Sequence, residues 1–283
     1  MNRPGIKSVL LLFCILSFKN AFNKPKLTDF AYNKYSQFGE DGIIQKIFDI
    51  IGTQSKIAVE FGAWDGFHLS NVAALWCVDP LWKAILIEGD RQRFETLKKN
   101  TMLFNVIPIQ AWVGIEKHDC LETILKNNGI TQTIDILSID IDGNDYHIFE
   151  SLKDIRPRLI IIEYNPTIPV TYDVYAPYSP DNNFGQSVGA LNRVAHKKGY
   201  KLVALTLTNA FYILENDFEK FADYETDLQL LNVNDGYITL VTTYDGKYAL
   251  VKNNKHVYYY GIEDQFNGVL KAIAFVVIQN HYL

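Results

Sequence analysis

Short apolar runs alternate with segments of helical period along most of the chain, from Leu27 to about Leu214. Such alternation is typical of a parallel sheet with helices packed on its faces. The pattern predicts strands at residues 57–61, 84–87, 106–111, 134–139, 159–162, 201–206 and 210–214. Only a short link separates the last two, so we expect an antiparallel hairpin there. The sequence thus predicts an α/β domain with a Rossmann-like, seven-stranded sheet.

Two segments depart from this pattern. Residues 165–187 are rich in Pro, Tyr, Asn and Asp without a period, which predicts a long loop over the strand ends. Loops of this length are usually functional lids or disordered segments. After Phe218 the residues alternate like a small antiparallel hairpin set, and residues 269–278 fit either a helix or a strand. We therefore divide the chain into an N-terminal segment (1–26), a main domain (27–218) and a Tyr-rich appendage (219–283).

The N-terminal segment leaves two interpretations open. Arg3 and Lys7 precede an apolar run at residues 9–18, as in a secretory signal peptide. However, Lys19 stands where cleavage after Ala21 would need a small residue, and the run is short for a bilayer span. The segment is either a buried or surface-lying helix, or one that exports the protein or associates it with a membrane.

Composition narrows the function only slightly. The 283 residues are 48% hydrophobic and 21% charged, as in an ordinary globular protein. A net charge of −5 argues against a nucleic-acid partner, which would favour a basic face. Cys14, Cys77 and Cys120 are widely spaced and odd in number, which suggests free thiols and a cytoplasmic location.

The most informative motif follows the first strand. That strand ends near Glu60, and two glycines come next, Gly62 and Gly66. Glycine lets the backbone approach a ligand closely, because it has no side chain. The second strand is also closed by an acid, Glu88, whose carboxylate can accept hydrogen bonds from both hydroxyls of a ribose. Together these residues predict a nucleoside pocket at the carboxyl ends of parallel strands.

The acids of this motif favour one cofactor. A dinucleotide fingerprint, Gly-x-Gly-x-x-Gly, leaves a helix N-terminus open for pyrophosphate, which Glu60 and Asp65 would repel. The same acids suit the positive sulfonium and amino groups of S-adenosylmethionine, and a purely structural turn is the alternative. Trp112 could lie against the adenine or belong to the core. The candidate cofactor residues are Glu60, Gly62, Ala63, Asp65, Gly66, Asn71, Glu88, Trp112 and Asp140.

A second polar group follows the strands at 134–139 and 159–162. Asp140 and Asp142 come after the first strand, and Glu163 and Asn165 after the second. Neighbouring strand ends would bring these four side chains to one rim, where carboxylate and amide oxygens could bind Mg²⁺. A bound cation would lower the pKa of a substrate hydroxyl. The alternative is an acid cluster that shapes the loops and contacts the methionine end of the cofactor.

Methyl transfer requires an aligned nucleophile and a group that removes its proton. The candidate catalytic bases are Asp140, Asp142 and His147. His147 lies one turn into a predicted helix, where a surface or packing role fits better than catalysis.

Four stretches in matching order resemble the FkbM-like methyltransferases: residues 35–42 (YSQFGEDG), 59–66 (VEFGAWDG), 138–146 (SIDIDGNDY) and 162–165 (IEYN). Residues 209–213 are similar to the last core strand of that group, so the likeness covers about residues 30–218. It implies a class I fold that uses S-adenosylmethionine, with Gly62, Asp65 and Glu88 at the cofactor. It also implies O-methylation, often of sugar or polyketide hydroxyls.

The resemblance extends to a metal site with two departures. Asp140 and the pair Glu163 and Asn165 are similar to the metal ligands of cation-dependent O-methyltransferases. Those enzymes usually carry Asp where this chain has Glu163, and here Tyr164 splits the pair.

We therefore expect an O-methyltransferase that acts on a hydroxyl of a sugar or glycoconjugate, with residues 165–187 closing over the acceptor. The aromatic residues of this loop could stack on sugar rings or pack the loop against its own domain; they are Tyr172, Tyr175, Tyr178 and Phe184. The alternatives are a NAD- or nucleotide-binding oxidoreductase, a non-catalytic domain of the same fold, and a membrane-tethered adaptor that uses residues 9–18.

Overall fold

The computed structural model describes residues 24–181, 184–231, 237–243, 248–252, 255–260 and 272–279. The apolar run at residues 9–18, with its predicted export or membrane role, lies outside these residues. Within the described part of the chain, no helix has the length and apolar character needed to cross a membrane.

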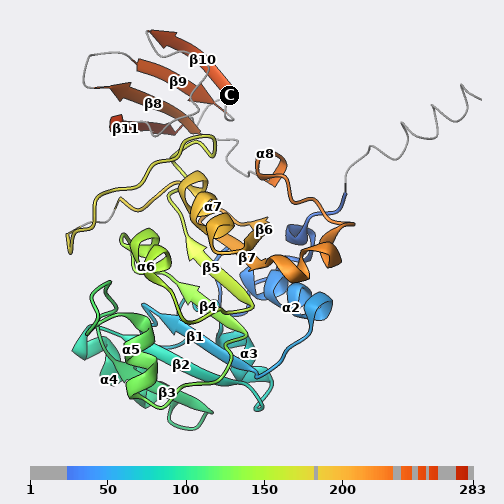
Figure 1. Ribbon diagram of the computed structural model, residues 1–283, viewed down its shortest axis with the longest axis vertical. Helices are drawn as coiled ribbons and strands as arrows, with labels where there is room; N and C mark the ends of the chain where they lie inside the picture. The colour runs from blue at the N-terminus through green and yellow to red at the C-terminus, as the bar shows by residue number, and fades with distance from the viewer. Residues whose placement is uncertain are drawn as a thin grey trace, which may run out of the picture.

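The main domain is built on one seven-stranded sheet in the order β3-β2-β1-β4-β5-β7-β6 (Figure 1). Its strands are β1 (Ile57–Phe61), β2 (Lys83–Glu88), β3 (Val106–Gln110), β4 (Ile136–Ile139), β5 (Leu159–Glu163), β6 (Tyr200–Leu205) and β7 (Asn209–Leu214). The first five run parallel, and β7 is antiparallel to both β5 and β6. This topology confirms the predicted α/β sheet with a terminal hairpin, the order of class I methyltransferases.

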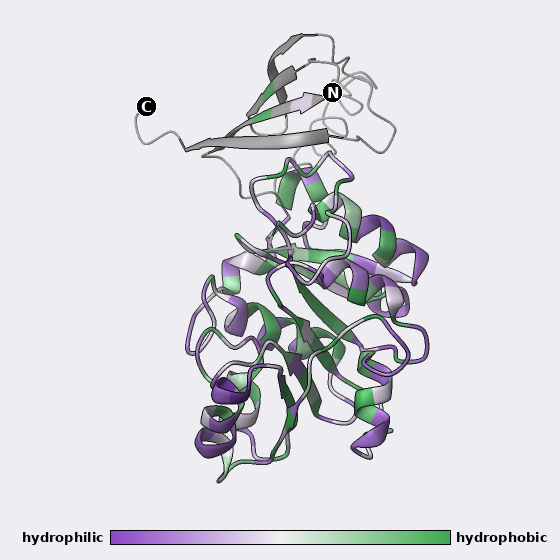
Figure 2. Ribbon diagram, turned by 90° about the vertical axis from the view of Figure 1, so that its left-hand side faces the viewer, coloured by the Kyte–Doolittle hydropathy of each residue, from purple (hydrophilic) through white to green (hydrophobic). Residues whose placement is uncertain are grey.

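Helices cover both faces of the sheet, because its central strands are apolar on both sides. One face packs against α5 (Leu121–Asn127), α6 (Asp145–Ser151) and α7 (Val188–Lys197). The other packs against α2 (Glu40–Ile51), α3 (Ala73–Val78) and α4 (Arg91–Thr101). In β1, Val59 faces the first layer and Ala58 the second. Figure 2 shows the resulting apolar sheet between helices whose outer surfaces are polar.

Strand limits agree with prediction to within one or two residues. β4 begins at Ile136, two residues later than predicted. Asp135, just before it, makes contacts outside the strand. The buried carboxylate of Asp135 accepts hydrogen bonds from the backbone N–H groups of residues 54–56 and pairs with Arg158 at 3.3 Å. The residues at this amino edge of the sheet therefore serve stability.

Short elements complete the main domain. They are η1 (Leu27–Phe30), η2 (Glu215–Phe221) and α8 (Leu228–Leu231). Phe221 and Leu231 are buried in the cores on opposite faces of the sheet, so the packing of the main domain continues beyond residue 218.

The C-terminal region forms a separate antiparallel sheet in the order β10-β9-β8-β11. Its strands are β8 (Tyr237–Thr243), β9 (Tyr248–Lys252), β10 (Lys255–Tyr260) and β11 (Ala272–Gln279). The predicted hairpin set is therefore confirmed. Of the two options for residues 269–278, the structure selects a strand, which pairs with β8.

Candidate functional site

Glu60 at the end of β1 supports the loop that follows it. Its buried carboxylate accepts hydrogen bonds from the hydroxyl of Ser70 and from the backbone N–H of Asn71, the latter at 2.9 Å. Burial raises the pKa of Glu60 to about 6. Asn71 in turn donates its side-chain amide to Ser138 of β4 at 3.1 Å. Glu60 and Asn71, both predicted to bind the cofactor, are thus placed where they hold the loop against the sheet.

The glycines of this loop have different roles. Gly62 has a φ of 76°, and a Cβ there would lie 1.9 Å from the carbonyl oxygen of Asp140. Gly62 therefore lets the ends of β1 and β4 meet. Gly66 has a φ of 88°, and a Cβ there would contact Leu97 of α4 at 2.8 Å, so this glycine permits close helix packing.

The other two predicted residues of the loop are engaged within the fold. The Asp65 carboxylate accepts hydrogen bonds from the backbone N–H groups of Phe67 and His68, which closes a local turn. Buried Ala63 donates its N–H to the carbonyl oxygen of Ile87 in β2 at 3.2 Å. Both residues thereby fix the path of the loop beside β2.

Glu88 at the end of β2 links the loops that follow β1 and β2. One carboxylate oxygen accepts the N–H of Trp64 and the other the N–H of Asp90, both at 2.8 Å. A carboxylate oxygen has two acceptor sites, so each keeps one for a further donor. The remaining acceptor sites of Glu88 are compatible with a pair of donating ribose hydroxyls, and the cofactor contact stays a prediction.

A pocket of about 510 Å³ is bordered by Trp64 and Asp90, the two residues whose N–H groups bond to the buried Glu88. Trp64, which is half-exposed, and Trp112, which is exposed, border it. The Arg93 guanidinium lies 4.8 Å from the ring centre of Trp64. Trp112, 75% exposed, lies with its ring against the backbone of Gly89, so the alternative of a core tryptophan is wrong. The lining residues are Trp64, Asp90, Gln92, Arg93, Thr96 and Trp112.

Sequence reasoning missed most of this lining. Trp64 lies within the quoted motif, and its position between two glycines was an available signal. Its φ of 45° is rare for a bulky residue and turns it out of the loop. Arg93 belongs to a polar helix and gave no signal, because its role depends on the packing of α4 beside this loop.

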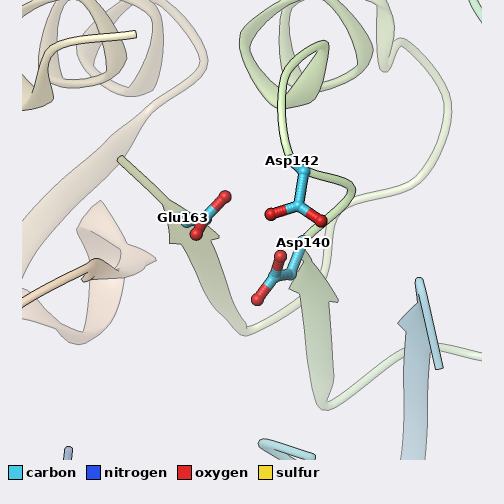
Figure 3. Close-up of side chains that lie close together, drawn as sticks. All are labelled: Asp140, Asp142 and Glu163. Atoms are coloured by element: carbon cyan, nitrogen blue, oxygen red, sulfur yellow. The ribbon is translucent and has the colours of Figure 1, made fainter. Parts of the chain in front are cut away.

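Asp140, Asp142 and Glu163 bring their carboxylates together at the ends of β4 and β5, with ligand oxygens within 4.8 Å of one another (Figure 3). Asp140 follows β4, Asp142 lies two residues further, and Glu163 ends β5. Asp142 has a φ of 58°, a conformation that Asp tolerates better than most residues. It is the exposed member of the three. The predicted convergence of these three residues is thus present.

The carboxylates of this cluster repel one another. Burial and the neighbouring negative charges raise the pKa values of Asp140 and Glu163 well above those of free carboxyl groups. Asp145, fully buried, accepts hydrogen bonds from the N–H groups of Ile141 and Gly143 and so shapes the turn that carries Asp142. Such a group gains from a positive charge placed among its oxygens.

The carboxylate separations suit a divalent cation. Ligand oxygens around one ion stand at most about 4.2 Å apart for Mg²⁺ and about 4.8 Å for Ca²⁺, twice the metal–oxygen distance. The three oxygens, within 4.8 Å of one another, need only a small closure to bind Mg²⁺. The residues present therefore fit a hard cation.

Asn165 does not join this cluster in the structure. Its side-chain oxygen accepts hydrogen bonds from the N–H and hydroxyl of Thr167, and its amide nitrogen donates to the carbonyl oxygen of Phe184 at 2.8 Å. Asn165 thereby organises the base of the loop at 165–187, and the fourth predicted metal ligand stands apart from the other three.

His147 packs against the same loop. Its Nε2 lies 2.9 Å from the carbonyl oxygen of Ala176, and its ring makes edge contacts with Tyr175 and Tyr178. This arrangement agrees with the packing role that the sequence favours for His147 over catalysis.

The loop aromatics divide between packing and exposure. Tyr172 is buried, while Tyr175 stacks on Tyr146 with ring centres 4.0 Å apart and remains partly exposed. Tyr178 is also exposed beside His147. Tyr175 and Tyr178 therefore form an aromatic ledge, anchored on α6 at the carboxyl edge of the sheet.

Comparisons with known proteins found one family model and several solved structures that are similar to part of this chain. Residues 118–202 match the model of the methyltransferase FkbM domain, a stretch that includes Asp140, Asp142 and Glu163. Similar solved structures include a SAM-dependent methyltransferase from Aquifex aeolicus, with 12% identity, 62% of this chain and 89% of that chain covered, and a TM-score of 0.37. Magnesium protoporphyrin IX methyltransferase from Synechocystis shares 9% identity, with 62% and 81% covered and a TM-score of 0.40. A search of curated proteins gave no match.

Proposed function

We propose that this chain, whose residues 118–202 match the methyltransferase FkbM domain, is an S-adenosylmethionine-dependent methyltransferase that methylates a hydroxyl oxygen of a sugar or glycoconjugate. The observation that carries the proposal is the convergence of Asp140, Asp142 and Glu163 at the strand ends beside β1. Within the described part of the chain no lysine or arginine forms an ion pair with these three carboxylates, which suits removal of a hydroxyl proton. The choice of a sugar as the acceptor rests on the aromatic ledge of Tyr175 and Tyr178.

Several residues would hold the cofactor, which when bound supplies a methyl group already activated by its sulfonium. Glu88 would accept the ribose hydroxyls with the acceptor sites left free by Trp64 and Asp90. Trp64 and Trp112 would border the adenosine in the pocket that they line. Gly62 keeps the backbone clear where β1 meets β4.

The acid cluster would prepare the acceptor. Asp142 is exposed, so its carboxylate can take the proton from the acceptor hydroxyl. The hydroxyl oxygen of the acceptor then attacks the methyl group. The half-buried Asp140 and Glu163 lie beside Asp142 and would help to position the acceptor hydroxyl. We include Mg²⁺ in the proposal, held by Asp140, Asp142 and Glu163, where it would lower the pKa of the acceptor hydroxyl.

The aromatic ledge would orient the acceptor. Sugar rings present apolar C–H faces, which stack on exposed aromatic rings, and Tyr175 and Tyr178 offer such rings near the cluster. Because Tyr175 is held by its stack on Tyr146, the ledge has a fixed orientation before the acceptor binds.

Calorimetric titration of the full chain with S-adenosylmethionine, and separately with NADH, tests the cofactor. We expect binding of the first only. Transfer of a labelled methyl group is then measured on panels of sugar hydroxyl, carboxylate and amine acceptors, with Mg²⁺ or EDTA. Sugar methylation that Asp142→Asn lowers at least 100-fold, with S-adenosylmethionine affinity retained, supports the proposal. Methylation of amines alone, or full activity of Asp142→Asn, contradicts it, and equal activity in EDTA contradicts the Mg²⁺ part.

A further inference from the structure

Two loops at the amino ends of β2 and β3 carry unusually exposed apolar side chains. Leu103 is 89% exposed, Met102 73%, Leu81 70% and Val78 66%. Among the described residues, these are four of the five most exposed large hydrophobic side chains. Val78 ends α3, Leu81 lies in the α3–β2 loop, and Met102 and Leu103 lie in the α4–β3 loop, at the edge of the sheet opposite the acid cluster (Figure 1).

The two loops form one surface. Asn105 in the second loop donates its side-chain amide to the carbonyl oxygen of Trp82 in the first, at 3.1 Å. Phe104 packs its ring 5.0 Å from that of Trp76, in the helix that ends at Val78. Trp76 and Trp82 are buried, so the exposed side chains project from a firm base.

The fold itself does not explain this exposure. Burying one such side chain stabilises a protein by roughly 1.5–3 kcal/mol, and none of the four obtains it from the domain. Soluble monomers rarely expose contiguous apolar patches beyond a few hundred Å², and larger ones mark docking surfaces. The projecting residues stand on loop tips, a shape that penetrates a soft surface better than it fills a pocket.

Exposed lysines flank these loops, although the whole chain has a net charge of −5 and the exposed Glu95 lies one turn before Lys98 and Lys99 in α4. Lys98 and Lys99 are exposed in the last turn of α4, and Lys83 begins β2. The nearest acid in the first loop, Asp79, is neutralised by Lys56 at 2.6 Å. Apolar tips beside lysines match the two layers of an anionic membrane, acyl chains below and phosphates above.

We propose that the α3–β2 and α4–β3 loops dock this protein on an anionic lipid bilayer. Leu81, Met102 and Leu103 enter the interface, while Lys98 and Lys99 contact lipid phosphates. The carboxyl edge of the sheet lies a strand length away, about 20 Å for the six residues of β2 at about 3.3 Å each. The acid cluster therefore stays open to water in the docked orientation. The inference does not depend on methyl transfer.

Co-sedimentation of the full chain with vesicles tests the docking surface. We compare phosphatidylcholine vesicles with vesicles that also contain phosphatidylglycerol, and expect binding to the anionic ones only. The double variant Leu81→Ser/Leu103→Ser should bind at least 10-fold more weakly. Lys98→Gln/Lys99→Gln should bind more weakly and with less salt dependence. Leu230→Ser, which replaces a 57% exposed leucine elsewhere, is the matched control and should bind like the unaltered chain.

A fluorescent reporter locates the contact. The emission of Leu103→Trp should shift to the blue on anionic vesicles and be quenched by brominated acyl chains. If Leu81→Ser/Leu103→Ser binds anionic vesicles as well as the unaltered chain does, the proposal is wrong. Membrane binding would then belong to another segment, such as residues 9–18. Failure of the unaltered chain to bind anionic vesicles would also overturn it. So would a concentration-dependent dimer, seen by sedimentation velocity, that the double variant abolishes.

Discussion

Gly62 and Asp140 lie so close together that no side chain fits between them. A Cβ on Gly62 would stand 1.9 Å from the carbonyl oxygen of Asp140. The residues just before them, Phe61 and Ile139, are register partners in β1 and β4. The position of the Asp140 carboxylate, and with it the geometry of the acid cluster, therefore depends on a glycine in the neighbouring strand's loop.

This contact predicts the effect of Gly62→Ala. The methyl group would push β4 away, and the positive φ of 76° adds backbone strain. We expect a loss of at least about 2 kcal/mol in the free energy of unfolding, together with weaker S-adenosylmethionine binding. Urea unfolding and calorimetry measure the two effects. Gly129→Ala is the control, because its φ is 73° but a Cβ would meet nothing within 4 Å. Equal losses in both variants would show that backbone strain alone acts.

The sequence predicts the sheet well because its signals are local. β1, β2 and β5 each contain an apolar run of at least three residues, and parallel strands buried on both faces need such runs. Asp140, Asp142 and Glu163 follow neighbouring strands, so topology alone brings them to one edge. The fold and the acid cluster were therefore predictable without coordinates.

The parts that could not be predicted depend on which way a side chain turns. Asp65 and Asn165 stand in the expected loops, yet the first caps its own turn and the second binds Thr167. Short polar side chains often bond to a nearby backbone group in this way, and sequence spacing does not reveal it. Arg93 joins Trp64 only because α4 packs beside the first loop.

Glu88→Gln tests the ribose contact. The variant keeps the size of the side chain but replaces one acceptor oxygen with an amide that donates, so it opposes either Trp64 N–H or Asp90 N–H. We expect S-adenosylmethionine affinity to fall 10- to 100-fold, which corresponds to about 1.4–2.8 kcal/mol. Calorimetric titration measures it. Glu95→Gln, on the exposed side of α4, should bind like the unaltered chain, and retained affinity in Glu88→Gln would exclude this role.

The buried Glu60 should make stability depend on pH. Its pKa is about 6 in the folded protein and about 4.5 when unfolded, so folding favours the protonated form. The stabilisation is present below pH 4.5 and is lost as the pH rises through 6, by about 2 kcal/mol at 1.36 kcal/mol per pKa unit. The difference in unfolding free energy between the unaltered chain and Glu60→Gln, measured from pH 4 to 7.5, isolates this group. A constant difference would contradict the assignment.

Residues at the amino edge of the sheet should contribute strongly to the free energy of unfolding, without a direct role in the acid cluster or the cofactor pocket. Asp135→Ala would leave the buried Arg158 with Asp217 as its remaining carboxylate partner and would leave three backbone N–H groups without an acceptor. We expect a loss of about 3–5 kcal/mol in unfolding free energy. Glu215→Ala removes an exposed pair with Lys201 and should cost less than about 1 kcal/mol. Chemical unfolding compares the two variants, and similar small losses would show that the buried pair is dispensable.

The aromatic ledge makes the last prediction, which concerns the acceptor. Tyr175→Ala removes a ring that stacks on Tyr146 at 4.0 Å and is partly exposed. If the acceptor sugar stacks there as strongly as a nucleic-acid base stacks on an aromatic ring, roughly 1–3 kcal/mol, its KM should rise about 10-fold or more. The KM for S-adenosylmethionine should stay the same. Tyr175→Phe keeps the ring and should behave like the unaltered chain, as should Tyr32→Ala at a 51% exposed tyrosine elsewhere. A rise in both KM values, or in neither, would remove the ledge from the acceptor site.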